Sequence, residues 1–168
     1  MKRTLIALAA LVAVLASTAA AADSFSVEFQ EARKALKVCG LTVAWTRSVE
    51  LKISIVGHGP DGIEYVSVLG DITETFTNKA GETARSFANV LEKDLHVTEN
   101  PDGTLTALEL ATGNATLYGP DGKAIARDPG QVRYTLYIDG DDVTFGEIVK
   151  DSTGRSDDFC TALVQALS

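Results

Sequence analysis

The sequence predicts an all-β protein built as an antiparallel meander of eight or nine strands. Two observations predict this class: apolar and polar side chains alternate along several segments, and short turn motifs separate those segments. Alternation with a period of two residues is the pattern of a strand with one buried face. Half-apolar strands belong to antiparallel sheets with one solvated side, and short connections place each strand beside its sequence neighbours.

The turn motifs are the strongest internal signal. Pro-Asp-Gly occurs three times, at residues 60–62, 101–103 and 120–122. Pro fixes φ for the first turn position, Asp bonds back to the local backbone, and Gly accepts the left-handed conformation. Residues 78–81 (Asn-Lys-Ala-Gly) and 139–142 (Asp-Gly-Asp-Asp) are two further candidates. Each motif predicts a hairpin.

The clearest alternation covers residues 41–55. Its apolar face would hold Leu41, Val43, Trp45, Val49, Leu51, Ile53 and Ile55. Three further apolar faces are predicted, the last of them weaker: Val66, Val68, Ile72 and Phe76; Val132, Tyr134, Leu136 and Ile138; Leu91, Leu95 and Val97. A large open sheet would leave exposed edges that invite aggregation. We therefore expect closure into a small β-barrel, with a two-sheet β-sandwich as the alternative.

The two ends of the domain predict short helices. Residues 27–38 form a helix-favouring stretch that Gly40 would end. Near the C-terminus, Ser156 could cap a helix whose first turn holds Asp157 and Asp158. An apolar stripe would follow at every fourth residue, formed by Phe159, Leu163 and Leu167.

The first 22 residues have the pattern of a cleavable export signal. Lys2 and Arg3 precede an apolar run over residues 5–16 and small residues over 17–22. The run is shorter than the roughly 20 residues that span a bilayer. We expect a secreted, extracellular protein whose single domain covers residues 23–168, with no membrane insertion after cleavage.

The chain is acidic, with a formal net charge of −8, and loss of residues 1–22 removes two cations and no acids. Such a field repels phosphate backbones, which argues against nucleic-acid partners. A small ligand or a protein partner remains possible, and we expect a monomer without a cofactor. The only cysteines are Cys39 and Cys160. In an oxidising compartment they predict one disulfide, with a pair of reactive thiols as the alternative.

Several short pieces occur in a distinctive order with the two cysteines. They are Val38-Cys39-Gly40, Thr77-Asn78, residues 102–106, residues 111–114, residues 119–122, Asp128-Pro129-Gly130 and Asp158-Phe159-Cys160. In this order the chain resembles a family of small secreted β-rich proteins of actinomycete bacteria with no known function. It departs from the family at Lys79-Ala80-Gly81, where a Thr-Gly is common. The resemblance implies export, a disulfide and a β-rich fold, and it supplies no catalytic residues.

Catalytic and metal-binding patterns are weak in this sequence. It contains no Gly-x-Ser-x-Gly elbow, and only His58 and His96 could act as a base near neutral pH. These features favour a protein that is not an enzyme. The cluster Asp139, Asp141 and Asp142 is a weak candidate for Ca²⁺, but an EF-hand counted from Asp139 would need a glutamate where Lys150 stands. A solvated hairpin tip is the favoured interpretation.

Three charged residues interrupt predicted apolar faces: Arg47, Glu74 and Lys93. Because buried polar groups cost free energy unless they are paired, these side chains and Trp45 could line the polar end of a ligand cavity. The alternative is a rim position in water, which a bulge at Gly70 would permit.

We therefore favour a binding domain for a small apolar or amphipathic ligand, with a cavity bounded by Trp45, Ile53 and Val68. The second hypothesis is an interaction or inhibitory module acting through loops such as residues 127–130, and the third is a secreted hydrolase.

Overall fold

The computed structural model describes residues 24–58 and 63–168, apart from the side chains of residues 56–58. The predicted export signal and the first Pro-Asp-Gly turn therefore lie outside the described residues. The side chain of His58 does as well.

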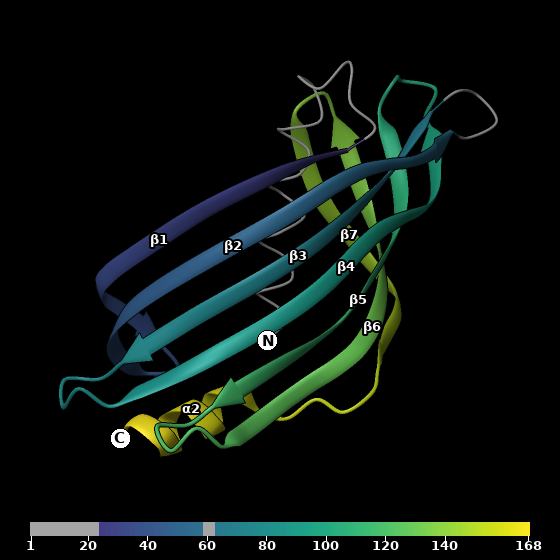
Figure 1. The fold of residues 1–168 in the computed structure, drawn as a ribbon. Helices are drawn as coiled ribbons and strands as arrows, with labels where there is room; N and C mark the ends of the chain where they lie inside the picture. The colour runs from purple at the N-terminus through teal and green to yellow at the C-terminus, as the bar shows by residue number, and fades with distance from the viewer. Residues whose placement is uncertain (1–23, 59–62) are drawn as a thin grey trace.

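The described chain folds into one antiparallel sheet whose strands follow sequence order (Figure 1). The strands are β1 (Ser24–Val38), β2 (Leu41–His58), β3 (Glu64–Thr77), β4 (Thr83–Glu99), β5 (Leu105–Tyr118), β6 (Ala124–Asp139) and β7 (Asp142–Thr153). This order confirms the all-β class and the meander. The described residues form seven strands, whereas eight or nine were predicted.

The sheet is strongly curved but open, with β1 and β7 as its two edges (Figure 1). The predicted closed barrel is wrong, and so is the two-sheet alternative. Two features of the edges oppose closure. β1 carries the exposed charged residues Glu31, Arg33 and Lys34, and charges discourage further pairing at an edge. On the other edge, the register of β7 against β6 shifts three times between Gln131 and Leu136.

The predicted N-terminal helix is also wrong, because residues 27–38 belong to strand β1. Its partly buried residues Phe25, Val27 and Phe29 lie opposite Ile53, Leu51 and Val49 of β2. Burial against this apolar strand overrides the local helix preference of the segment.

The connection from β1 to β2 is a two-residue turn at Cys39 and Gly40. Their φ angles are 52° and 83°, so both residues are left-handed. Two consecutive left-handed residues are the pattern of a type I′ hairpin turn. Gly40, which the sequence predicted as a helix end, instead closes a hairpin.

The four predicted turns that lie within the described residues all form. Asn78 and Gly81 close the β3–β4 turn, and the β6–β7 turn joins Asp139 to Asp142. In each remaining Pro-Asp-Gly turn the glycine N–H donates to the carbonyl three residues earlier, at 2.9 Å. The aspartate side chain accepts from the backbone two residues later, at 3.1 Å. Both interactions are those that the motif predicts.

The apolar faces predicted for β2, β3 and β6 are confirmed. Val49 is fully buried, and Val68 and Leu136 are buried on the same face. The prediction for β4 is partly wrong, since Val90 and Val97 are buried whereas Leu95 is exposed. The register shifts between Asp94 and His96, and this irregularity reverses the faces of the residues on either side of it.

Three glycines lie on one line across the sheet. Gly70 of β3 and Gly113 of β5 both pair with Val90 of β4, and Gly113 pairs with Gly130 of β6. A Cβ on Gly113 would overlap the carbonyl oxygen of Asn89. Glycine within strands marks bends and close backbone approaches. This glycine line therefore permits the curvature that Figure 1 shows in β5 and β6.

Helix α2 (Phe159–Leu167) packs on the end of the sheet that carries the β3–β4 and β5–β6 turns (Figure 1). The face that it covers is the inner face. Leu163 and Leu167 are buried there, and Phe76, Trp45 and Leu117 join the same core cluster. The predicted helix and its stripe are thus confirmed.

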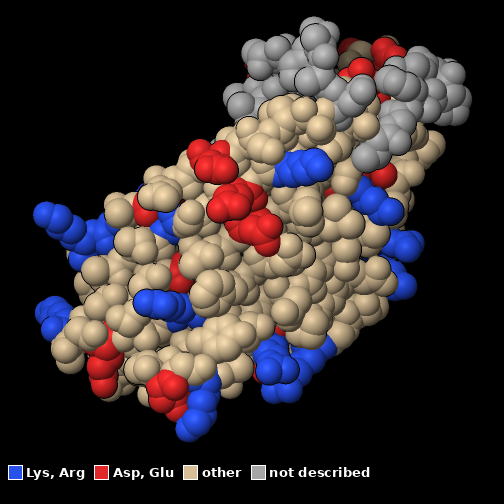
Figure 2. Space-filling model, in the orientation of Figure 1, with Lys and Arg blue, Asp and Glu red and all other residues tan. Residues whose placement is uncertain are grey.

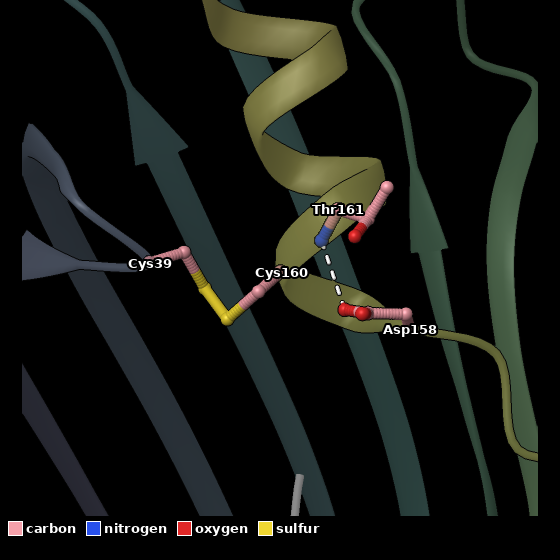
Figure 3. Close-up of a disulfide and its surroundings, with 4 residues drawn as sticks. All are labelled: Cys39, Asp158, Cys160 and Thr161. Atoms are coloured by element: carbon pink, nitrogen blue, oxygen red, sulfur yellow. Dashed lines mark hydrogen bonds between the residues drawn. A yellow bond between two sulfur atoms is a disulfide. The ribbon is translucent and has the colours of Figure 1, made fainter.

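The cap of α2 is Asp158 and not Ser156. The Asp158 carboxylate accepts from the Thr161 N–H at 2.9 Å (Figure 3). The opposite end of the helix is held by Asn78, whose Nδ2 donates to the Leu167 carbonyl at 2.9 Å. Both ends of α2 are therefore fixed by polar contacts.

A disulfide joins Cys39 in the β1–β2 turn to Cys160 in the first turn of α2 (Figure 3). The predicted pairing is confirmed, and it links residues 121 positions apart. Among the described residues, no helix has both the length and the apolar character needed to cross a membrane.

Replacing Cys160 by Ser should lower the free energy of unfolding by about 2 to 5 kcal/mol, because the long loop that the disulfide closes would regain its entropy in the unfolded chain. Urea unfolding in non-reducing buffer measures this change. The variant Cys39→Ser is the matched control and should lose as much stability. An unchanged unfolding midpoint in both variants would contradict the prediction.

Replacing Gly113 by Ala should destabilise the fold by about 1 to 3 kcal/mol, because the new methyl group has no room beside β4. Gly119→Ala is the control, since a Cβ there would meet Asp121 and Ile125 at an ordinary 3.4 Å. Thermal unfolding of the two variants provides the comparison. Equal melting temperatures would show that the glycine line is not required for the bend.

Candidate functional site

The inner face of the sheet holds a trough made of two pockets that meet at Tyr134. The first, which we call the helix-side pocket, lies next to α2 and has a volume of about 560 Å³. The second, the turn-side pocket, lies toward the β4–β5 and β6–β7 turns and has a volume of about 430 Å³. Both volumes fall within the range of small-molecule sites.

The helix-side pocket is hollow because small residues line its floor. They are Ala88, Ala111, Gly113, Ala115 and Gly130, and they come from β4, β5 and β6. Larger apolar side chains form its walls, among them Ile72, Val90, Val132 and Phe145. Within residues 24–58 and 63–168, α2 covers only one end of the inner face, and no second layer of protein lies over this apolar surface.

Three of the predicted ligand-binding residues come together at one side of this pocket. Trp45 Nε1 donates to Glu74 Oε1 at 3.2 Å, and both residues line the pocket. Arg47 lies directly opposite Glu74 in the β2–β3 register. Burial raises the pKa of Glu74, while the charge of Arg47 and the hydrogen bond from Trp45 oppose that rise. The Arg47 Nε atom is buried and has no hydrogen-bond partner among the described residues.

Lys93, the fourth predicted residue, does not join them. Lys93 follows Glu92, which lines the turn-side pocket, so its side chain points to the opposite face. It lies across from Ser67 of β3 and Leu110 of β5. The sequence pattern grouped Lys93 with Val97, but the register shift between Asp94 and His96 places these two side chains on opposite faces of β4.

The sequence analysis missed a buried acidic group in the middle of the trough. Glu92 and Glu109 are only 4% and 7% exposed, and Tyr134 is also buried. The register places Glu109 between Asp94 of β4 and Tyr134 of β6. Asp94 Oδ2 accepts from the Val66 N–H at 2.6 Å. The alternation of Ala107, Glu109 and Ala111 with partly exposed residues does indicate a buried face of β5, but alanines do not stand out as core residues in a sequence.

Burial controls the ionisation of this group. Desolvation raises the pKa of Glu92 to about 7, and the hydrogen bond from Tyr134 opposes the rise. Desolvation also raises the pKa of Glu109 far above its ordinary value, and Asp94 and Glu92 add to the rise. The pKa of Tyr134 rises because it is buried beside these carboxylates. Near neutral pH the two glutamates therefore retain protons that exposed carboxylic acids would have lost.

The remaining predicted positions lie outside the trough or at its rim. His96 is exposed on β4 and lines neither pocket. Asp139, Asp141 and Asp142 are exposed at the β6–β7 turn. The described residues contain no group of three His, Cys, Asp or Glu side chains arranged to hold a metal ion. Residues 127–130, predicted as a loop, are part of strand β6.

Acidic residues also mark the outer face of the sheet. The register places Glu28, Glu50 and Asp71 side by side across β1, β2 and β3, and all three are exposed. Figure 2 shows acidic side chains gathered on the face that it presents, with cations scattered around them. The exposed carboxylates give this part of the outer face a negative electrostatic field.

Comparisons of the chain with protein-family models, with curated proteins and with solved structures found no match. The functional inference consequently rests on the trough and on the residues that line it.

The buried glutamates should make the protein less stable as the pH rises. Because the pKa of Glu92 is higher in the folded protein than its ordinary value of 4.5, the folded state retains a proton that the unfolded chain releases. The free energy of unfolding should therefore fall by on the order of 2 kcal/mol between pH 5 and pH 8.

Urea unfolding at both pH values measures this fall. In Glu92→Gln the fall should be smaller, because the amide cannot ionise. Glu99→Gln is the control, since Glu99 is exposed on the same strand. A fall of equal size in the wild type and in Glu92→Gln would contradict the assignment of this pH dependence to Glu92.

Proposed function

We propose that this chain is a secreted, non-enzymatic binding domain that holds a small apolar or amphipathic molecule in the trough on the inner face of its sheet. The observation that carries the proposal is the helix-side pocket of about 560 Å³, whose floor is alanine and glycine and whose walls are apolar. The disulfide and the leader pattern support export to an oxidising compartment.

The trough suits a ligand because the part of the chain that the structure describes leaves most of this apolar surface uncovered. A single curved sheet with one apolar face must cover that face with another element. Here α2 covers one end, and small side chains leave the remainder hollow. Each Å² of apolar surface that a ligand covers contributes about 25 cal/mol to binding.

Polar groups at defined points of the trough would orient an amphipathic molecule. Trp45 and Glu74 lie beside the helix-side pocket, and Glu92 and Tyr134 lie near its junction with the turn-side pocket. Pockets with apolar walls and a few fixed polar groups are typical of small-molecule sites. The competing hypotheses have less support, because residues 127–130 form no loop and His96 lines neither pocket.

Filling the floor of the helix-side pocket tests the proposal. Ala88 and Ala115 are cross-strand neighbours that both line the pocket. The double variant Ala88→Leu/Ala115→Leu should bind the neutral fluorescent probe N-phenyl-1-naphthylamine at least about tenfold more weakly, since the new side chains occupy space that the probe needs. Fluorescence titration measures the dissociation constant.

Thr46→Leu is the control, because Thr46 is exposed on the opposite face of β2 and the variant adds apolar surface outside the trough. It should bind the probe as the wild type does. Native mass spectrometry of the protein purified from the growth medium adds a second readout, since a retained ligand would appear as added mass. A bare protein that also fails to bind the probe would overturn the proposal.

A further inference from the structure

Building on the proposed function, we infer that the turn-side pocket receives the cationic head of an amphiphile, an organic ammonium group that donates an N–H hydrogen bond to Glu92 Oε1. The apolar part of the same molecule would lie along the trough. Three independent observations support this inference: the sign of the charges in the pocket, an unused acceptor atom, and the apolar walls around it.

Five of the six ionisable side chains that line the turn-side pocket are carboxylic acids. They are Glu64 from β3, Glu92 and Asp94 from β4, Glu109 from β5 and Asp141 from the β6–β7 turn. Tyr134 from β6 is the remaining titratable group. Among the described residues of this lining there is no lysine, arginine or histidine. The resulting field attracts a cation and repels a carboxylate or phosphate.

Glu92 supplies the acceptor. Its Oε1 atom is buried, and it has no hydrogen-bond partner among the described residues although the side chain is only 4% exposed. A buried acceptor without a partner costs free energy, which a donor on a ligand would recover. The nearby carboxyl of Asp94 already accepts from the Val66 N–H. Glu92 is therefore the acid in this group that has a free position for an incoming donor.

The walls around Glu92 require that the ligand also has an apolar part. They include Val66, Val68, Val97, Leu136, Ile138 and Val143. A bare metal ion would leave these surfaces uncovered, and the acids do not converge into a metal-binding group within the described residues. An ammonium group on an aliphatic chain matches both the acids and the walls, and the Tyr134 junction continues into the helix-side pocket.

The protonation of Glu92 makes the expected affinity for an ammonium group depend on pH. Burial raises the pKa of this carboxyl to about 7, so without a ligand Glu92 is largely neutral in mild acid. A bound ammonium group favours the carboxylate and therefore expels the proton. The other titratable side chains that face the same pocket are Glu64, Asp94, Glu109, Tyr134 and Asp141.

Calorimetric titration of the full mature protein with decylammonium chloride and with decanol tests the inference. We expect decylammonium to bind at least about tenfold more tightly than decanol at pH 8, because its ammonium group would pair with the buried Glu92 carboxylate. Its affinity should fall by up to about tenfold per pH unit below pH 7, because one proton must be released. Decanol should show no such dependence.

Glu92→Gln should weaken decylammonium binding about tenfold or more at pH 8 while changing decanol binding less than about twofold. Glu99→Gln is the matched control, because it removes an exposed acid from the same strand outside the pocket. Decanol binding also reports whether each variant is folded. A third probe, decyltrimethylammonium, carries the charge without an N–H and should bind more weakly than decylammonium.

The outcomes separate this inference from the proposed function. Equal binding of decylammonium and decanol, unaffected by Glu92→Gln, would overturn the ammonium site and leave the amphiphile-binding trough standing. Equal binding of decylammonium and decyltrimethylammonium would overturn the hydrogen bond to Glu92. If none of the three probes binds, both the inference and the proposed function fail.

Discussion

One constraint governs this fold: a single sheet with an apolar inner face must cover that face without a second sheet. Helix α2 provides the cover at one end, where Leu163 and Leu167 join a core cluster with residues of β2 to β6. The bond between Cys39 and Cys160 holds the helix there, and the Asn78 side chain anchors its last turn. Toward the other end, none of the described elements covers the apolar inner face, and the curved sheet alone surrounds it. The trough thus forms because α2 is too short to cover the whole apolar inner face of the sheet.

Much of the fold could be predicted because its signals are local. The alternation of residues 41–55, the described turns, α2 and the cysteine pair all follow from short sequence patterns. The prediction of an N-terminal helix was wrong. The helix preference of this segment stabilises it less than the burial of Phe25, Val27 and Phe29 against β2 does. The predicted closure was wrong because it depends on whether β1 and β7 pair, and pairing between segments so distant in the sequence follows from no local alternation or turn pattern.

The candidate site shows the same division. Arg47, Glu74 and Trp45 could be grouped because neighbouring strands of a meander bring them together. Lys93 was misplaced by one irregularity in β4, since a single extra residue exchanges the two faces of a strand. Glu109 was missed because it alternates with Ala107 and Ala111, which do not stand out as core residues. Glu92 was missed because Leu91, Leu95 and Val97 were assigned to the buried face of β4, which would leave Glu92 in solvent. Their burial comes from Tyr134 and from the bend of the sheet, neither of which a linear pattern contains.

The curvature of the sheet depends on the backbone at Gly70, Gly113 and Gly130, which lie on one line across the strands. The alanines and valines on either side of that line therefore determine how much space the trough has and how apolar it is, but they do not determine the curvature of the sheet. Exchange of these neighbours would alter what fits inside while leaving the architecture intact. Proteins that share this backbone could thus change their ligand preference through single substitutions, as long as the three glycines are kept.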